Sequence, residues 1–141
     1  MYQESVTTQA KAICHLFLHC CYKDGNFSEE EVDNVAGKLT ALELHRELNM
    51  KDELHAYRSY AGSIVNERGY VDYLLKLIAP VNELALFSYC MELGVSDSKL
   101  DTSEIRLFDL IGDILQIGPD QRLLVQKLIS QRQLVTMQKY F

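Results

Sequence analysis

The feature that most constrains this fold is an acidic motif that occurs twice, at an offset of 73 residues. Each copy has an Asp, an apolar residue three positions later and a Glu seven positions after the Asp. The first copy runs from Asp24 to Glu31 and the second from Asp97 to Glu104. We call these segments the first and second acidic corners. Each lies between two apolar stretches with helical spacing, which predicts a duplicated helix-loop-helix.

The residues around the two acidic corners also match at this offset. The predicted copies span about residues 6–48 and 80–117, and apolar side chains occupy equivalent positions in both. The matched pairs are Ile13 and Leu86, Cys20 and Leu93, Phe27 and Leu100, Val32 and Ile105, Val35 and Phe108, and Leu42 and Leu115. The sequence therefore predicts an internal pseudo-repeat.

The whole chain has the apolar periodicity of helices, and no segment alternates like a strand. We expect an all-α fold, a compact bundle of about seven helices, in a single domain over residues 1–141, because 48% apolar composition is enough for a sizeable core. The residues of the third helix expected to face inward are Leu54, Tyr57, Ala61, Ile64 and Val65. Gly69 is predicted to end this helix, and Pro80 to begin the fifth. The predicted helices cover about 6–22, 28–42, 53–68, 71–78, 80–93 and 105–115, with a last helix from 119.

Composition and charge exclude several classes of function. The formal net charge is -6 and the pI is about 5.1, so the chain is expected to repel nucleic acid and anionic lipid. No stretch approaches the roughly 20 apolar residues of a membrane span, so no direct membrane insertion is expected. The four cysteines lack paired spacing, and no secretory signal is visible at the start, which favours buried thiols in a cytoplasmic protein.

Helix capping alone explains much of the two motifs. Ser28 followed by Glu31 has the spacing of a capping box, and Asp101 with Glu104 repeats that spacing. A calcium loop of the EF-hand type is a second interpretation, because Gly25, an apolar residue and a final Glu resemble the second half of such a loop. The oxygen ligands of its first half are missing, since Cys20 stands there.

At these same residues the chain resembles the TerB-like family of tellurite resistance proteins. The family signature is a helix, then Asp-Gly-x-apolar, then a Glu seven residues after the Asp. The first copy matches in full with Asp24, Gly25, Phe27 and Glu31, whereas the second has Ser98 where Gly is usual. The resemblance covers roughly residues 6–132.

This resemblance implies an all-helical bundle with a pseudo-repeat and an acidic cluster that holds a divalent cation. The implied metal ligands are Asp24, Glu31, Asp97 and Glu104, and the implied cofactor is a weakly bound divalent cation such as calcium or magnesium. It also implies a role in tellurite or other chemical stress. We therefore expect a non-enzymatic binding or scaffold module. The alternatives are a metal-dependent hydrolase that uses the same carboxylates and a metal-free structural interaction domain.

Two further features were weighed as binding sites. His15 and His19 have the i, i+4 spacing of a zinc pair, but no third ligand has support in the sequence, so a polar or half-buried helix face is expected. The last helix, from Pro119 to Phe141, has Asp120 as its one acidic residue and ends in apolar side chains. A basic solvated face over an ordinary core stripe explains this helix. The alternative is a partner surface or a homo-oligomer through this C-terminal helix, since a protein partner is expected for the domain.

Overall fold

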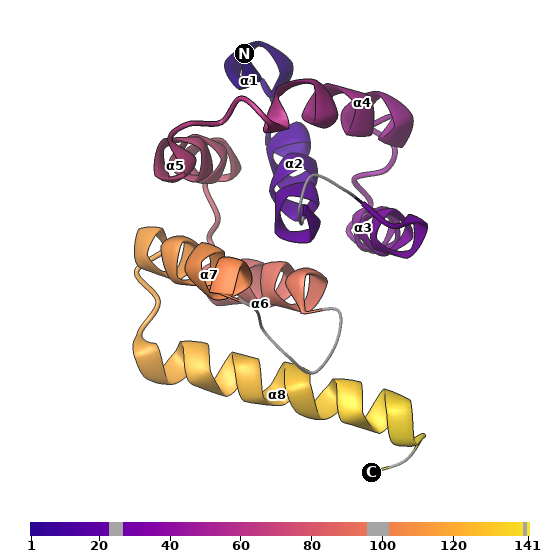
Figure 1. The fold of residues 1–141 in the computed structure, drawn as a ribbon, viewed down its shortest axis with the longest axis vertical. Coiled ribbons are helices and arrows are strands. Elements are labelled where there is room, and N and C mark those ends of the chain that lie inside the picture. The colour runs from indigo at the N-terminus through magenta and orange to yellow at the C-terminus, as the bar shows by residue number, and fades with distance from the viewer. Residues whose placement is uncertain (23–26, 96–101, 140) are drawn as a thin grey trace. The chain divides into compact units, whose positions relative to one another are not determined.

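The computed structural model describes residues 1–22, 27–95, 102–139 and 141. These residues form eight helices and no strand, which confirms the all-α prediction (Figure 1). None of these helices is long and apolar enough to cross a membrane. The helices are α1 (Tyr2–Ser5), α2 (Gln9–Cys21), α3 (Glu29–Ala41), α4 (Met50–Ala61), α5 (Glu67–Ile78), α6 (Glu83–Gly94), α7 (Thr102–Ile114) and α8 (Pro119–Gln138).

The chain divides into two compact units, Met1–Pro80 and Val81–Phe141. The first holds α1 to α5 and the second holds α6 to α8. The helix pairs α2–α3 and α6–α7 occupy the two predicted copies of the repeat. The duplication itself, and the assignment of all 141 residues to one domain, stay predictions.

Helix α2 is the centre of the first unit. Ten of its thirteen residues are buried, and it contacts α3, α4 and α5, while α1 contacts α4. Figure 1 shows α2 lying between α3 on one side and α5 on the other, with α4 across one end. The predicted fourth helix, about 71–78, is the C-terminal part of α5, and its Val71, Leu74, Leu75 and Ile78 are all buried.

The prediction of a third helix from Glu53 to Arg68 was wrong. Helix α4 ends at Ala61, and Val65, expected to face inward, is 99% exposed. Asn66 begins α5 as its N-cap, and its side chain accepts a hydrogen bond of 3.0 Å from the amide of Gly69. A Cβ at position 69 would lie 2.7 Å from the Asn66 side-chain nitrogen, so this glycine accommodates a cap and does not end a helix.

The predicted helix start at Pro80 was also wrong by three residues. Helix α5 ends at Ile78, and its C-cap, Ala79, has a left-handed φ of 46°, whereas α6 begins at Glu83 after its N-cap, Asn82. Pro80 lies in the connection between these helices, where it lacks the amide hydrogen that a continuing helix would use.

In the second unit, α6 packs against both α7 and α8. Its core is formed by Phe87, Cys90 and Met91 of α6 together with Phe108 and Ile111 of α7. Helix α8 has twenty residues, of which Ile129 is the one that is buried. Most of the surface of α8 is therefore accessible.

Candidate functional site

Two of the four predicted metal ligands, Asp24 and Asp97, lie outside the described residues. The other two, Glu31 and Glu104, are each in the first turn of a helix. The positive end of a helix dipole lies there, and it favours a negative charge. The structure thus places both described candidates in equivalent local positions, one in each compact unit.

The first acidic corner contains the predicted capping box. The amide of Glu31 donates to Ser28 Oγ over 3.1 Å, and the amide of Ser28 donates to Glu31 Oε1 over 2.9 Å. Two of the backbone amides at the start of α3 are therefore satisfied by side chains. The Glu31 carboxylate is held at a defined place, with one of its oxygens accepting the backbone hydrogen bond.

The second acidic corner holds a buried carboxylate. Glu104 is 7% exposed in the first turn of α7, although carboxylates are rarely buried to this extent. Asp101, the predicted capping partner of Glu104, lies outside the described residues. Glu104 is therefore the more enclosed of the two described candidates.

The chemistry of these candidates fits a hard cation, because calcium and magnesium take carboxylate oxygens as ligands. Among the described residues, no group of three or more His, Cys, Asp and Glu side chains is placed to hold a metal ion. A complete ligand set at either acidic corner would need Asp24 or Asp97. The metal site therefore stays a prediction.

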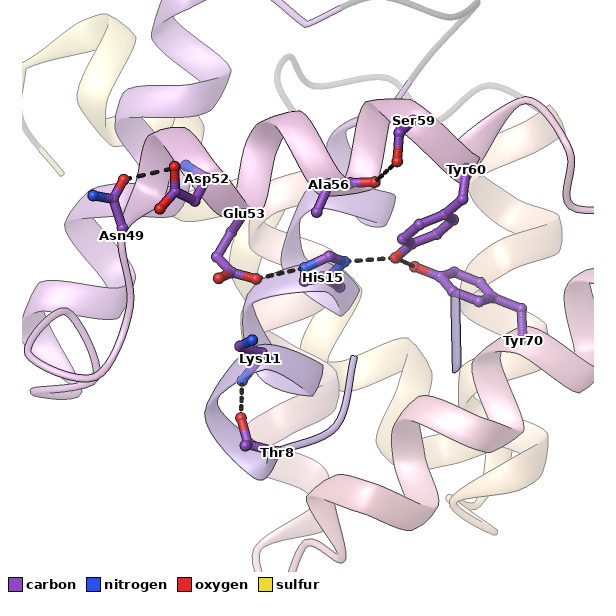
Figure 2. A network of polar contacts seen from close by, with 10 residues as sticks. All are labelled: Thr8, Lys11, His15, Asn49, Asp52, Glu53, Ala56, Ser59, Tyr60 and Tyr70. Atoms are coloured by element: carbon purple, nitrogen blue, oxygen red, sulfur yellow. Dashed lines mark hydrogen bonds and ion pairs between the residues drawn. The ribbon is translucent and has the colours of Figure 1, made fainter. Parts of the chain in front are cut away.

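A network of buried polar side chains lies at the centre of the first unit, where α2 meets α4 and α5 (Figure 2). His15 is wholly buried, and its Nδ1 lies 2.6 Å from the hydroxyl of Tyr60. Its Nε2 lies 2.9 Å from Oε1 of Glu53, which is 7% exposed. The Tyr60 hydroxyl lies 2.6 Å from that of Tyr70. Four side chains from three helices thus form one continuous chain.

A second chain of the same type begins one helical turn further along α2. Nδ1 of His19 lies 2.7 Å from the hydroxyl of Tyr57, and its Nε2 lies 2.9 Å from Oε2 of Glu67. The Glu67 side chain is 46% exposed, so this chain reaches solvent, whereas the His15 chain is buried throughout. Each histidine thus joins a tyrosine on one side to a glutamate on the other.

The partners fix the direction of the His15 chain. A carboxylate only accepts hydrogen bonds, so Nε2–H of His15 donates to Glu53. In a neutral imidazole Nδ1 then accepts from the Tyr60 hydroxyl, whose oxygen accepts from Tyr70. Every proton in this arrangement has an acceptor, which makes neutral His15 the form that satisfies the whole chain.

Burial also favours the neutral form of His15 and of the tyrosines around it. It lowers the pKa of His15, against the opposing influence of the hydrogen bond and charge of Glu53. It also raises the pKa of the phenols of Tyr57, Tyr60 and Tyr70. Desolvation disfavours the charged form of each group, so the network is held neutral apart from its carboxylates.

The structure corrects the expectation that His15 and His19 lie on a polar or half-buried helix face. His15 is 0% exposed and His19 is 9% exposed. Both nitrogens of each ring contact a tyrosine or a glutamate, so these contacts do not favour zinc ligation. The signal that sequence reasoning missed is Glu53, Tyr57 and Tyr60, whose i, i+4, i+7 spacing places three polar tips on one face of α4.

Comparison with known proteins supports one assignment. The family model described as tellurite resistance protein TerB matches residues 10–127, which include both acidic corners and the buried network. No curated protein and no solved structure shows a significant match to the chain. Because the match covers most of the chain and agrees with the all-helical fold, the chain belongs to the TerB family.

Proposed function

We propose that this TerB domain is a non-enzymatic binding module that holds a divalent cation at its acidic corners. The ligands are Asp24 and Glu31 in the first corner, and Asp97 and Glu104 in the second. The observation that carries the proposal is the position of the two described carboxylates. Glu31 and Glu104 each end an acidic corner and lie in the first turn of a helix.

The charge and chemistry of these residues favour a weakly held calcium or magnesium ion. Carboxylates gathered at one corner repel each other, and a hard cation relieves that repulsion. Glu31 already accepts one backbone hydrogen bond through Oε1, which leaves its second oxygen to bind the ion. Two carboxylates at a corner are fewer than a tight calcium site provides, so the affinity is low.

A thermal melt with and without cation tests this proposal. The protein is treated with a chelator, and its melting temperature is then measured in millimolar calcium or magnesium. At a cation concentration of about 100 times the dissociation constant, linkage stabilises the folded state by roughly 2.7 kcal/mol. We expect a rise in melting temperature of several degrees in the wild-type protein.

Two variants separate binding from capping in the first corner. Glu31→Gln keeps the capping box, because Gln also accepts the Ser28 amide, but it removes the charge. We expect it to abolish the cation-dependent rise. Ser28→Ala removes the cap and lowers stability by about 1 kcal/mol, and the rise should persist. Glu104→Gln should keep most of the rise, because Gly25 permits a tight turn that Ser98 hinders.

A melting temperature that is indifferent to both cations would refute cation binding. The metal-free interaction domain would then be the better account. A loss of the rise in Ser28→Ala equal to that in Glu31→Gln would show that the cap, and not the charge, produces the effect.

The second part of the proposal is a protein partner that binds the exposed face of α8. This face is basic and apolar, with Lys127 among four large apolar side chains that are each more than half exposed. Exposed apolar patches of this kind mark interaction surfaces. The chain is acidic as a whole, with net charge -6, so a second copy offers complementary charge to this helix. The four apolar residues are Leu123, Leu124, Leu128 and Met137.

Light scattering after size-exclusion chromatography measures whether α8 joins two copies. We expect a dimer that Leu128→Glu dissociates. A wild-type monomer at high protein concentration would exclude self-association and leave a different protein as the partner of α8.

Cellular setting follows from two observations. All four cysteines are free and buried, which supports a reducing cytoplasmic environment. Family membership supports a role in the response to tellurite or other chemical stress.

A further inference from the structure

Helix α4 packs against α2 through a buried face that consists mainly of side chains with polar tips. Of the four residues that α4 buries, three are Glu53, Tyr57 and Tyr60, and the fourth is Ala61. The polar tips of the first three all bond to a histidine of α2. The docking of α4 therefore depends on hydrogen bonds whose strength changes with the protonation of those histidines.

The same helix contacts Tyr22 and Phe27, the described residues on either side of positions 23–26. The ring of Tyr57 packs against those of Tyr22 and Phe27, with centroid distances of 5.4 and 5.7 Å. Tyr22 and Phe27 also contact each other at 5.3 Å. On the next residue of α4, the guanidinium of Arg58 lies 5.6 Å from the centre of the Phe27 ring. Displacement of α4 would remove each of these contacts except that between Tyr22 and Phe27.

We propose that α4 is a proton-operated latch on Tyr22 and Phe27, the described residues on either side of positions 23–26. Neutral His15 holds α4 against α2, and α4 in turn holds Tyr22 and Phe27. Protonation of His15 releases α4, and with it the contacts that Tyr57 and Arg58 make with these two residues. The latch is inferred from the network alone, whereas its effect on cation binding rests on the function proposed above.

The direction of the hydrogen bonds explains why a proton opens the latch. Imidazolium donates from both nitrogens, so the Tyr60 oxygen accepts from Nδ1–H of protonated His15. The hydrogen bond between the Tyr60 and Tyr70 hydroxyls then uses one of their two protons, and the other proton has no acceptor among the described residues, although both tyrosines are buried. A buried donor without an acceptor is costly, and rotation of α4 away from α2 relieves that cost.

The charged groups around His15 have opposing effects on its pKa. From α4, the Glu53 carboxylate favours imidazolium, whereas Lys11 on α2 itself opposes it. His19 and Glu67 also face the network, and the other titratable groups around it are thiols and phenols. They are Cys14 and Cys20 of α2, Tyr57 and Tyr60 of α4, Tyr70 of α5, Tyr22 after α2, and Tyr2 of α1. Burial exceeds the attraction of Glu53, so the pKa of His15 is lowered.

The sign of the pH effect follows from this lowered pKa. An opened α4 exposes His15 to water, where its pKa returns to about 6.5. The open form therefore binds a proton more readily than the closed form, and acid favours opening. The latch is fully closed above pH 6.5, and it weakens as the pH falls from there toward the lowered pKa of the closed form.

Amide hydrogen exchange in α4 between pH 7.5 and 5.5 tests the latch without any cation. After correction for intrinsic exchange, we expect the opening constant of α4 to rise by up to tenfold per pH unit below about 6.5. His15→Gln keeps a donor for Glu53 and an acceptor for Tyr60 but cannot be protonated, so the rise should disappear. His55→Gln removes an exposed histidine of the same helix and should keep the rise.

Protection of α4 that is independent of pH, or an equal rise in the wild type and His15→Gln, would overturn the latch. If His15→Gln does not fold, the imidazole resonances of wild-type His15 give a second measurement, and a pKa at or above 6.5 would also overturn it. A calcium titration at pH 7.5 and 5.5 then tests the link to the corner. We expect weaker binding at pH 5.5 in the wild type than in His15→Gln. Calcium binding with no difference between the two proteins refutes the link, and no calcium binding at pH 7.5 refutes the proposed function while leaving the latch to the exchange test.

Discussion

The direction of the buried hydrogen-bond chain predicts unequal effects for two chemically identical substitutions. Tyr60→Phe and Tyr70→Phe each delete one hydroxyl, and both residues are buried. The Tyr70 hydroxyl is the first donor of the chain, so its loss removes one hydrogen bond and leaves Tyr60 donating to His15. The expected cost is that of one neutral hydrogen bond, about 1 kcal/mol.

Loss of the Tyr60 hydroxyl is more damaging because it lies in the middle of the chain. Tyr60→Phe leaves the Tyr70 proton without its acceptor and His15 Nδ1 without its donor. Each unsatisfied buried group costs about 1–3 kcal/mol, so the expected loss is about 2–6 kcal/mol. This is a large share of the 5–15 kcal/mol that typically stabilises a small protein.

Urea denaturation followed by far-ultraviolet circular dichroism gives the free energy of unfolding of both variants at pH 7.5. Similar slopes against urea would show that the two transitions are comparable. Equal losses, or a larger loss in Tyr70→Phe, would refute the direction assigned to the chain and with it the neutral state of His15.

Three further substitutions and one thiol-labelling experiment have predicted outcomes. Gly37 lies inside α3 with open space at its Cβ, so Gly37→Ala should raise the free energy of unfolding by about 0.5–1 kcal/mol in urea denaturation. Gly112→Ala should give no such gain, because a Cβ there would lie 2.7 Å from the guanidinium carbon of Arg122 and displace a side chain that caps the Ile117 carbonyl. Asn66→Ala should cost about 1 kcal/mol in the same assay, through loss of the cap of α5. Burial raises the pKa of Cys14 to about 12, so at pH 8 a disulfide reagent should label this thiol only as fast as the first unit opens, and faster labelling would contradict its burial.

The sequence was sufficient where an element buries aliphatic side chains at helical spacing. The helices α2 and α5 were predicted from the spacing of their apolar residues, most of which are buried. The predicted end of α4 was wrong because Ile64 and Val65 continue the apolar spacing beyond Ala61, where the helix ends. Helix α4 instead buries Glu53 and Tyr60, which hydropathy does not mark as core residues.

In the candidate sites, contacts between residues close in the sequence could be predicted, and contacts between distant residues could not. The capping box of Ser28 and Glu31 was predicted because both partners lie within three residues of each other. The network of His15 could not be predicted, since its partners Glu53 and Tyr60 lie 38 and 45 residues away. Without knowledge of which helices pack together, a histidine pair on α2 has no visible partners.

The most direct test of the central claim is a crystal structure grown with manganese, which takes the same oxygen ligands as magnesium and calcium and gives an anomalous signal. The account predicts an anomalous peak at the first acidic corner, within bonding distance of a Glu31 carboxylate oxygen. Glu31→Gln crystals grown in the same solution should lack that peak. A map with no peak at either corner, and with the Glu31 carboxylate bonded to the Ser28 amide alone, would contradict the claim that this TerB domain binds a cation there.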